Sequence, residues 1–344
     1  MKKIFTIFLF IFSLFLLSGC GKDTLDFPEY KDEDQVEMTS EEVNTLLSDI
    51  DMEEAMKKTL KLSMQIDLKL SSDLDFGLSS FNGSVDMDLS LTSTSYMIIS
   101  EIVEEAQIHS VNTFNMTQKA TYKGSSYFED STTKIKGDIN AYLIDQYLYY
   151  DSDINNSDDF ELFNNGKFKL DSMITQEKWD EFVVDPSGIT DDYLDVDITP
   201  NVLLESLEAI ESLMALEMIS VYEDDAKHIV VIDITKQKML ENIDVFIEMS
   251  NDTSTWTVEE FASKRVEFTN EMMAFKTMDM SIALVVEEGQ LNNLGIKLDM
   301  TMEPSGSTVE FNAIILMDMN VEMPAFPDDL DTYKITEAPE NELF

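Results

Sequence analysis

The chain of 344 residues contains 69 Asp and Glu residues against 23 Lys and Arg residues, which gives a formal net charge of −46 at pH 7. A surface this acidic argues against a nucleic-acid partner, because nucleic-acid binding needs positive charge to displace counterions. It also argues against a protein that lies flat on anionic lipid. Hydrophobic residues make up 44% of the chain, which is enough for a sizeable core.

The first 20 residues have the pattern of an export signal. Two lysines follow Met1, an apolar run extends to Leu17, and the run ends in the letters LSGC, of which the last is Cys20. About 14 apolar residues suit a signal-peptide core and are short for a helix that spans a membrane. The motif resembles the lipobox of bacterial lipoproteins. It implies a signal peptide over residues 1–19, removed by cleavage before Cys20.

Lipidation of Cys20 is the expected consequence, because only a thiol can receive a diacylglyceryl group as a thioether. Each buried methylene adds about 0.8 kcal/mol, and two or more acyl chains make anchoring stable. We therefore expect a lipid-anchored protein at the outer, extracytoplasmic face of the cell membrane. The alternatives are an ordinary signal peptide cut nearby and an uncleaved anchor. Cys20 is the only cysteine in the chain, so an intramolecular disulfide framework is excluded.

Residues 20–39 are polar and acidic, and they include Pro28 and the letters KDED at 31–34. This composition predicts a flexible tether with a typical reach of roughly 25 Å. A helix over 41–58 is expected next, capped by Thr39 or Ser40. We expect one folded domain over residues 40–333 and a polar C-terminal tail over 334–344.

Strand patterns dominate the following part of the chain. Apolar and polar residues alternate over 60–70 and again over 85–91, as in antiparallel strands with one buried face. Residues 139–150 predict a hairpin about Asp145-Gln146. The middle of the chain is more helical, with a short segment at Trp179 and Phe182 and a longer helix that begins at 199–200.

The C-terminal third contains the clearest pattern. A strand over 229–234 and a helix over 236–249 are expected first, and residues 256–271 fit either helix or strand. Alternation then predicts three long strands over 278–286, 294–302 and 309–323, with a turn at Glu288-Gly289. Three consecutive long antiparallel strands predict an α+β fold: a large curved antiparallel sheet, or open half-barrel, with helices packed on its concave face.

This order of elements resembles the LolA/LppX-like superfamily of exported lipid carriers. The resemblance rests on the helix that runs directly into strand 60–70, the tyrosine-rich hairpin at 141–149, the helix-rich insert, and the final meander that ends in the letters MPAFP at 323–327. It implies a half-barrel whose helices close a hydrophobic cavity for lipid or acyl chains. No single residue defines that cavity in the family, and this chain lacks a basic patch that would hold an anionic headgroup.

Six methionines are candidates for lining such a cavity, because methionine is flexible and polarisable and adapts to mobile acyl chains. They alternate along the three C-terminal strands: Met278, Met280, Met300, Met302, Met317 and Met319. A plain hydrophobic core is the alternative interpretation of the same residues. Two functions follow: a lipoprotein that binds or carries a lipid or another apolar ligand, and a structural or interaction lipoprotein with a filled core and an unknown protein partner.

Sequence signals for enzymatic chemistry are weak, so neither an enzyme, a cofactor nor a metal is expected. His109 and His228 lie in no metal-binding or nucleophile pattern. Residues 131–134, with the letters STTK, match the Ser-x-x-Lys motif of penicillin-recognising enzymes, but the two further motifs of those enzymes do not occur. Residues 151–155 begin like a calcium loop, yet they lack the glycine at position six and the glutamate at position twelve. A second acidic cluster, over 191–197, has the same weakness.

Overall fold

The computed structural model describes residues 25–48, 50, 58–78, 81–100, 102–123, 129–156, 166–177, 179, 207–224, 226–250, 256–304 and 307–336. The expected signal peptide, Cys20, Phe182, the acidic cluster at 191–197 and the helix start at 199–200 lie outside these residues. So do residues 51–57, most of the second half of the helix expected over 41–58.

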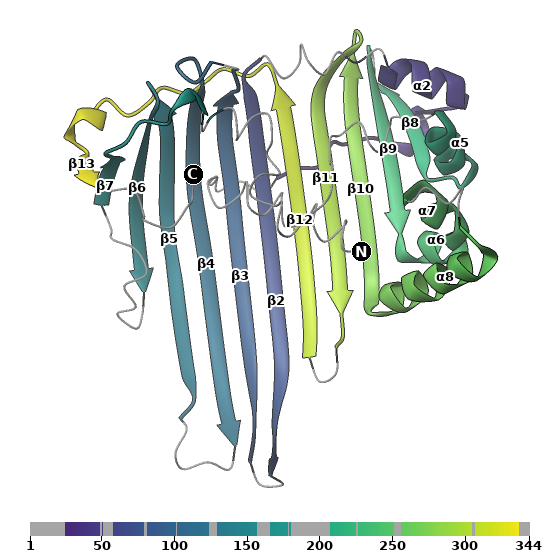
Figure 1. Ribbon diagram of the computed structural model, residues 1–344, viewed down its shortest axis with the longest axis horizontal. Helices are drawn as coiled ribbons and strands as arrows, with labels where there is room; N and C mark the ends of the chain where they lie inside the picture. The colour runs from purple at the N-terminus through teal and green to yellow at the C-terminus, as the bar shows by residue number, and fades with distance from the viewer. Residues whose placement is uncertain are drawn as a thin grey trace.

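A single open sheet of thirteen strands dominates the described structure (Figure 1). Its order from one edge to the other is β1-β8-β9-β10-β11-β12-β2-β3-β4-β5-β6-β7-β13. All neighbours pair antiparallel except β13 and β7, which pair parallel. The first six strands in this order are β1 Gln35–Val36, β8 Ile219–Asp224, β9 Lys227–Thr235, β10 Phe275–Glu287, β11 Gln290–Met302 and β12 Ser307–Met319. The other seven are β2 Leu60–Leu78, β3 Phe81–Ile98, β4 Gln107–Lys123, β5 Ser131–Ile144, β6 Tyr147–Asn156, β7 Gly166–Leu170 and β13 Lys334–Thr336.

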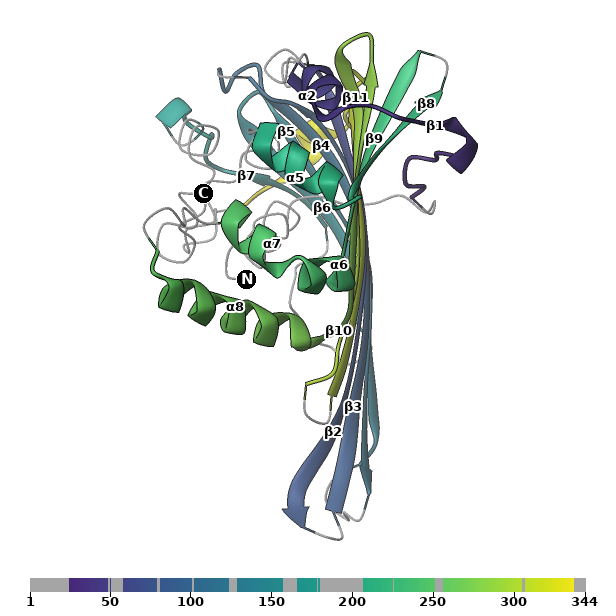
Figure 2. The ribbon, with the colours of Figure 1, turned by 90° about the vertical axis from the view of Figure 1, so that its right-hand side faces the viewer.

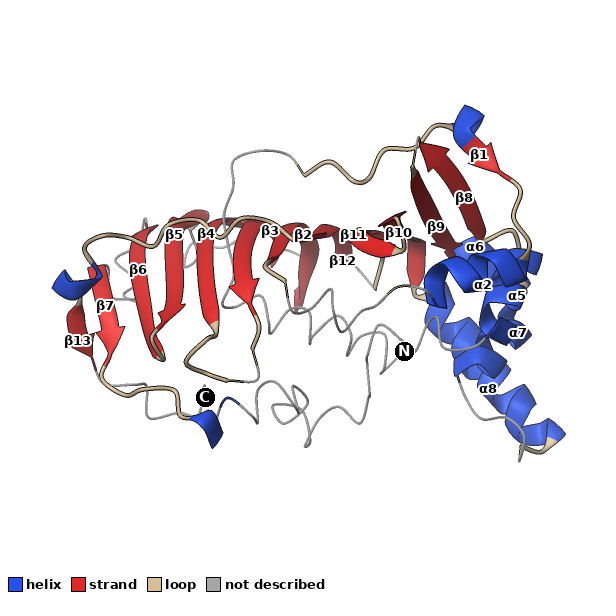
Figure 3. Ribbon diagram, turned by 90° about the horizontal axis from the view of Figure 1, so that it is seen from above, coloured by secondary structure: helices blue, strands red, loops and turns tan. Residues whose placement is uncertain are grey.

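The predicted fold class is confirmed in these terms: a large, mostly antiparallel sheet that is not closed, with a few helices. β1 and β13 are the two edges, and they lie at opposite ends of the sheet when it is seen from above (Figure 3). The α-helices gather near the β8–β10 end and lie on one side of the sheet (Figure 2). They are α2 Ser40–Ser48, α5 Leu207–Ala215, α6 Lys236–Glu241, α7 Ile243–Ser250 and α8 Val258–Met273.

Two of the predicted turns are confirmed by their backbone angles. The hairpin between β5 and β6 turns at Asp145 and Gln146, whose φ angles are 50° and 68°. Positive φ at both central residues matches the right-handed twist of two paired strands. Glu288 and Gly289 turn β10 into β11 in the same way, with φ of 51° and 74°.

Two predicted elements differ from the expected ones: one strand ends early and one helix is divided. The strand expected over 309–323 stops at Met319, because Asn320 has φ of 57° and the backbone N–H of Val321 donates to the carbonyl of Thr59 over 3.1 Å. The helix expected over 236–249 is divided into α6 and α7 at Asn242. The Asn242 side chain donates to the carbonyl of Lys238 over 2.9 Å, and this bond caps α6.

The ambiguous segment 256–271 is helical. Thr257 begins α8 with a reciprocal capping box: its hydroxyl accepts from the Glu260 N–H over 3.2 Å, and its own N–H donates to the Glu260 carboxylate over 2.7 Å. These two bonds satisfy N–H groups that a helix start leaves without partners. Only Met272 of the sixteen residues in α8 is fully buried.

The ends of the described chain pack on the sheet and differ from the flexible segments that composition predicts. β1 lies within the expected tether and pairs with β8, and the Tyr30 ring lies 4.4 Å from the Tyr222 ring. β13 extends the sheet to Thr336, three residues past the expected domain end at 333. Short strands at both edges leave little exposed backbone for pairing with another chain.

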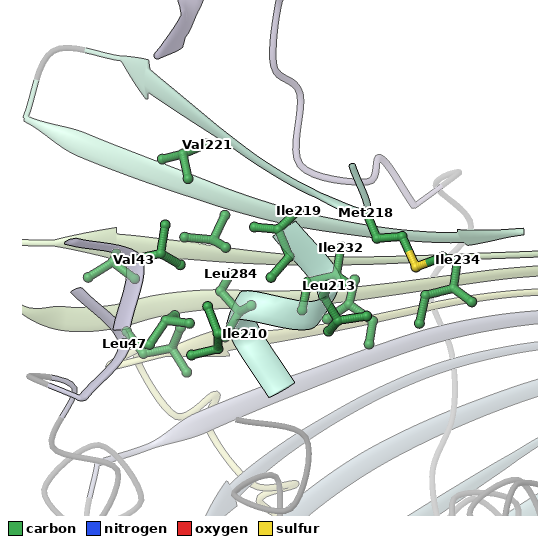
Figure 4. Packing of buried hydrophobic residues seen from close by; sticks show 14 of the residues in the cluster. Val43, Leu47, Ile210, Leu213, Met218, Ile219, Val221, Ile232, Ile234 and Leu284 are labelled. Carbon is green, nitrogen blue, oxygen red and sulfur yellow. The ribbon is translucent and has the colours of Figure 1, made fainter. Parts of the chain in front are cut away.

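The main hydrophobic core lies between the helices and the β8–β10 end of the sheet (Figure 4). Val43 and Leu47 of α2 and Ile210 and Leu213 of α5 point toward sheet residues such as Leu284. Burying one such side chain fully stabilises the fold by about 1.5–3 kcal/mol. This core holds the helices on one face of the sheet.

Candidate apolar binding face

Strand register places most apolar side chains of the sheet on one face, the face that carries the helices. Residues directly opposite each other on neighbouring strands share a face. The row Met278–Met300–Phe311–Leu68–Leu89–Met116–Ile135 therefore runs across seven strands, from β10 to β5, without a polar interruption. We call this side of the sheet the apolar face.

All six candidate methionines lie on the apolar face of three adjacent strands. Met278 pairs with Met300, Met280 with Leu298, and Met302 with Val309. Met317 lies between Leu294 and Leu62, and Met319 lies opposite Leu60. The register thus brings the six together along one side of β10, β11 and β12.

Burial divides the six methionines into two groups. Met278 and Met319 are 3% and 8% exposed and belong to the core beneath the helices. Met280, Met300, Met302 and Met317 are half-buried. Met300 packs against this core and also against a second cluster, formed by Met64, Ile66, Phe311 and Ala313. Met280 and Met317 also pack against the main core. Full burial in the core therefore explains two of the six, whereas the other four keep accessible surface and remain candidates for contact with a ligand.

A small group of polar side chains interrupts the apolar face between β3 and β4. The Ser95 hydroxyl donates to the Ser110 hydroxyl over 3.1 Å, and the Asn112 side chain donates to the carbonyl of Ile139. Ser93 is 1% exposed, and its hydroxyl is buried without a hydrogen-bond partner among the described residues. A buried hydroxyl without a partner costs free energy, so it favours any polar atom that reaches it.

The opposite face of the sheet is polar in its middle, and we call it the polar face. Lys61 and Asp318, which face each other on β2 and β12, form an ion pair of 3.3 Å. Ser90, Asp67 and Asn115 make up a polar cross-strand row beside the apolar row of Leu89. This strict alternation makes the two faces chemically distinct.

A segment that follows β12 packs across the β4–β7 end of the polar face. The Phe326 ring stacks on His109 at 5.7 Å, and His109 also meets the Tyr142 ring at 5.0 Å. Lys167 of β7 forms a 2.6 Å ion pair with Asp329. Burial raises the pKa of Tyr142 to about 12. These contacts hold residues 320–333, which we call the strap, against the polar face.

His109 should make the stability of the strap depend on pH. Burial lowers the pKa of His109, and a hydrogen bond to the backbone of Pro324 offsets part of this effect. As the pH falls, His109 therefore takes up a proton at a higher pH in the unfolded chain than in the folded chain. The folded state loses stability as the pH falls from about 6.5 through the lower pKa of the folded state.

In wild type, the urea concentration at the midpoint of unfolding should fall between pH 7 and pH 5. We expect His109→Phe to reduce this loss. His228→Phe is the matched control and should leave that loss unchanged. An equal loss in wild type and His109→Phe would contradict a role for His109.

The Ser-x-x-Lys motif and the first acidic cluster lie among the described residues, and both fall on strands. Ser131 and Lys134 lie three residues apart on β5, so their side chains point to opposite faces of the sheet. Asp151 and Asp153 lie on β6 rather than in a loop, and burial raises the pKa of Asp151. Within the described ranges, no group of three or more His, Cys, Asp or Glu residues is placed to hold a metal ion. None of the described helices is long and apolar enough to span a membrane.

Comparison with known proteins assigns the chain to no family. No family model matches it, and no curated protein matches it. Among solved structures, a β-barrel-like protein of the DUF1849 family from Brucella abortus is 10% identical, with a TM-score of 0.12, over 76% of this chain and 98% of that one. The translocator domain of the autotransporter NalP from Neisseria meningitidis is 4% identical, with a TM-score of 0.12, over 81% of this chain and 93% of that one. OccK11 (OpdR) from Pseudomonas aeruginosa is 8% identical, with a TM-score of 0.13, over 78% of this chain and 67% of that one. TM-scores this low carry no functional argument.

Proposed function

We propose that the chain is an extracytoplasmic lipoprotein, anchored through Cys20, that binds a lipid or another apolar molecule between the apolar face of its sheet and the helices. The observation that carries the proposal is the continuous apolar row from β10 to β5, many of whose side chains remain half-buried. Contiguous apolar surface of this kind is typical of ligand-binding or interaction sites. The LolA/LppX-like order of elements agrees with a guest in that position.

The polar group between β3 and β4 supports a guest with one polar end. Ligand sites are mostly apolar, with a few polar groups that fix the orientation of the ligand. The buried hydroxyl of Ser93 offers a donor for a carbonyl or carboxylate oxygen, and the hydroxyls of Ser95 and Ser110 lie on the same face. A fatty acid or an acylated lipid has this combination of groups.

Titration with a fluorescent fatty acid tests the proposal through two adjacent residues of β3. Leu89 lies on the apolar face and Ser90 on the polar face. We expect Leu89→Asp to weaken binding at least fivefold, because an acyl chain that packs on this position would remove water from the new carboxylate, which costs free energy. Ser90→Asp introduces the same charge on the other face and should leave affinity unchanged. Equal affinities for the two variants, with melting temperatures matched to wild type, would contradict a guest on the apolar face.

An interaction lipoprotein remains the second candidate, and a surface on α8 favours it. Val258, Val266 and Met273 are 88%, 61% and 64% exposed. At 3.6 residues per turn, the three fall within about one third of the helix circumference. Such a stripe suits contact with another protein. The absence of any bound apolar molecule, together with loss of a partner contact on Val266→Glu, would favour this candidate.

A further inference from the structure

A cavity lies on the polar face of the sheet, at the end opposite the strap. Residues 27–34 pass over β8 and β9 on the side away from the helices (Figure 3). Together they line a pocket of about 410 Å³ that is half open to solvent. Ligand pockets span roughly 300–1,000 Å³, so this one suits a small molecule.

Aromatic rings form one part of the cavity wall. Tyr30 and Tyr222 lie with ring centroids 4.4 Å apart at an interplanar angle of 31°. Tyr222 is 7% exposed and packs with Ile229, Val231 and Ala283, so its position is fixed by the sheet. A tyrosine phenol is neutral at physiological pH, and burial raises the pKa of Tyr30 further. Because the two rings cover each other and Tyr222 is buried, the accessible aromatic surface of the wall belongs to Tyr30, which is half-buried.

Carboxylates form the other part of the wall. Glu29, Asp34 and Asp224 line the cavity, and Lys31 supplies the one positive charge among the lining residues. The Asp34 N–H donates to the carbonyl of Lys31 over 2.9 Å, which closes the turn that carries both side chains. Three negative charges against one positive charge make the cavity selective for cations.

We propose that this pocket binds a small organic cation of the quaternary-ammonium type, with its head against the accessible side of the Tyr30 ring and its charge balanced by Asp34 and Asp224. A quaternary ammonium has no N–H to donate, so an aromatic face and nearby carboxylates replace hydrogen bonds in its recognition. The site lies on the polar face and does not depend on lipid binding at the apolar face. The acidic rim repels phosphate, which favours a free cation over a phosphocholine headgroup.

Isothermal titration of the full-length protein in a maltoside detergent tests the proposal with choline as the probe. The neutral isostere 3,3-dimethylbutan-1-ol has the same shape without the charge. We expect choline to bind at least tenfold more tightly than the isostere and at least fivefold more tightly than phosphocholine. Equal binding of choline and the isostere, or no binding of choline, would overturn the proposal. Tighter binding of phosphocholine would overturn the assignment of a free cation.

Five variants separate the proposed contacts from general effects on folding. Tyr30→Leu and Asp34→Asn should each weaken choline binding at least fivefold, whereas Tyr30→Phe keeps the ring and should bind as wild type does. Lys31→Gln removes the competing charge and should strengthen binding. Glu33→Gln is the charge-matched control, because Glu33 lies on the same turn outside the lining and is not among the charged groups that act on Tyr30. Equal weakening by Asp34→Asn and Glu33→Gln, with unchanged circular dichroism, would show a general charge effect and refute the site.

Discussion

Replacement of Cys20 by serine is expected to abolish labelling of the protein with radioactive palmitate and to release it from the membrane fraction. A serine hydroxyl cannot form the thioether that holds the diacylglyceryl group, and the chain has no second cysteine. Without the lipid, the protein loses about 0.8 kcal/mol of membrane-binding free energy for each methylene group that the acyl chains would bury. The measurement is autoradiography of the immunoprecipitated protein after growth with labelled palmitate.

Ser18→Ala is the matched control for this prediction. It changes a residue two positions from Cys20 and keeps a small side chain there, so labelling should continue at the wild-type level. Continued labelling of Cys20→Ser would contradict lipidation at this position. Loss of labelling in both variants would indicate a general defect in export.

The second large effect is expected at the boundary between the two clusters of the apolar face. Met300 is half-buried and packs against both clusters, whereas Met278, its cross-strand partner, is 3% exposed in the main core. If a guest lies against Met300, a tryptophan there competes with the guest for space. We expect Met300→Trp to lower fatty-acid binding several-fold while it leaves the free energy of unfolding within about 1 kcal/mol of wild type.

Met278→Trp is the matched comparison, because the same bulk is added on the adjacent strand to a site that protein already fills. Overpacking of a core costs about 1–3 kcal/mol. We therefore expect Met278→Trp to destabilise the fold by that amount, as measured by urea denaturation. A Met300→Trp variant that is destabilised as much as Met278→Trp, in a protein that binds no fatty acid, would mean that the core is filled at both positions.

Local patterns predicted the strands and turns that depend on neighbouring residues. The alternation over 60–70 lies within β2, and the alternation over 85–91 lies within β3. The hairpin at Asp145-Gln146 and the turn at Glu288-Gly289 needed no information beyond a few residues. The one-sided placement of the six methionines also followed, because residues two apart on a strand share a face.

Features that depend on distant pairing could not be predicted. β12 pairs with β2 across more than 230 positions of sequence, and that pairing joins the C-terminal meander to the N-terminal strands. Residues 25–36 resemble a tether in composition, yet Tyr30 and Val36 pack against β8 and its neighbours. The early end of β12 depends on one residue, Asn320, and a bond to Thr59.

The candidate sites, too, could be predicted only where they depend on local sequence. The sequence identified the methionines of the apolar face, but it gave no sign that Met278 and Met319 are core residues, because burial depends on which helices cover them. The cavity beside Tyr30 and Tyr222 escaped sequence analysis entirely. Its walls come from segments almost 200 residues apart, and an acidic stretch with one tyrosine has no recognisable pattern until β8 lies beneath it.

Native mass spectrometry of residues 20–344 carrying Cys20→Ser, followed by organic extraction, tests lipid binding most directly. The substitution removes the covalent lipid, so any lipid that is detected is held without a covalent bond. The account predicts a complex of one chain with one apolar molecule, which is lost or reduced in Met300→Trp and retained in Ser90→Asp. A folded chain that carries no apolar molecule after purification, and takes none up from added fatty acid, would contradict it.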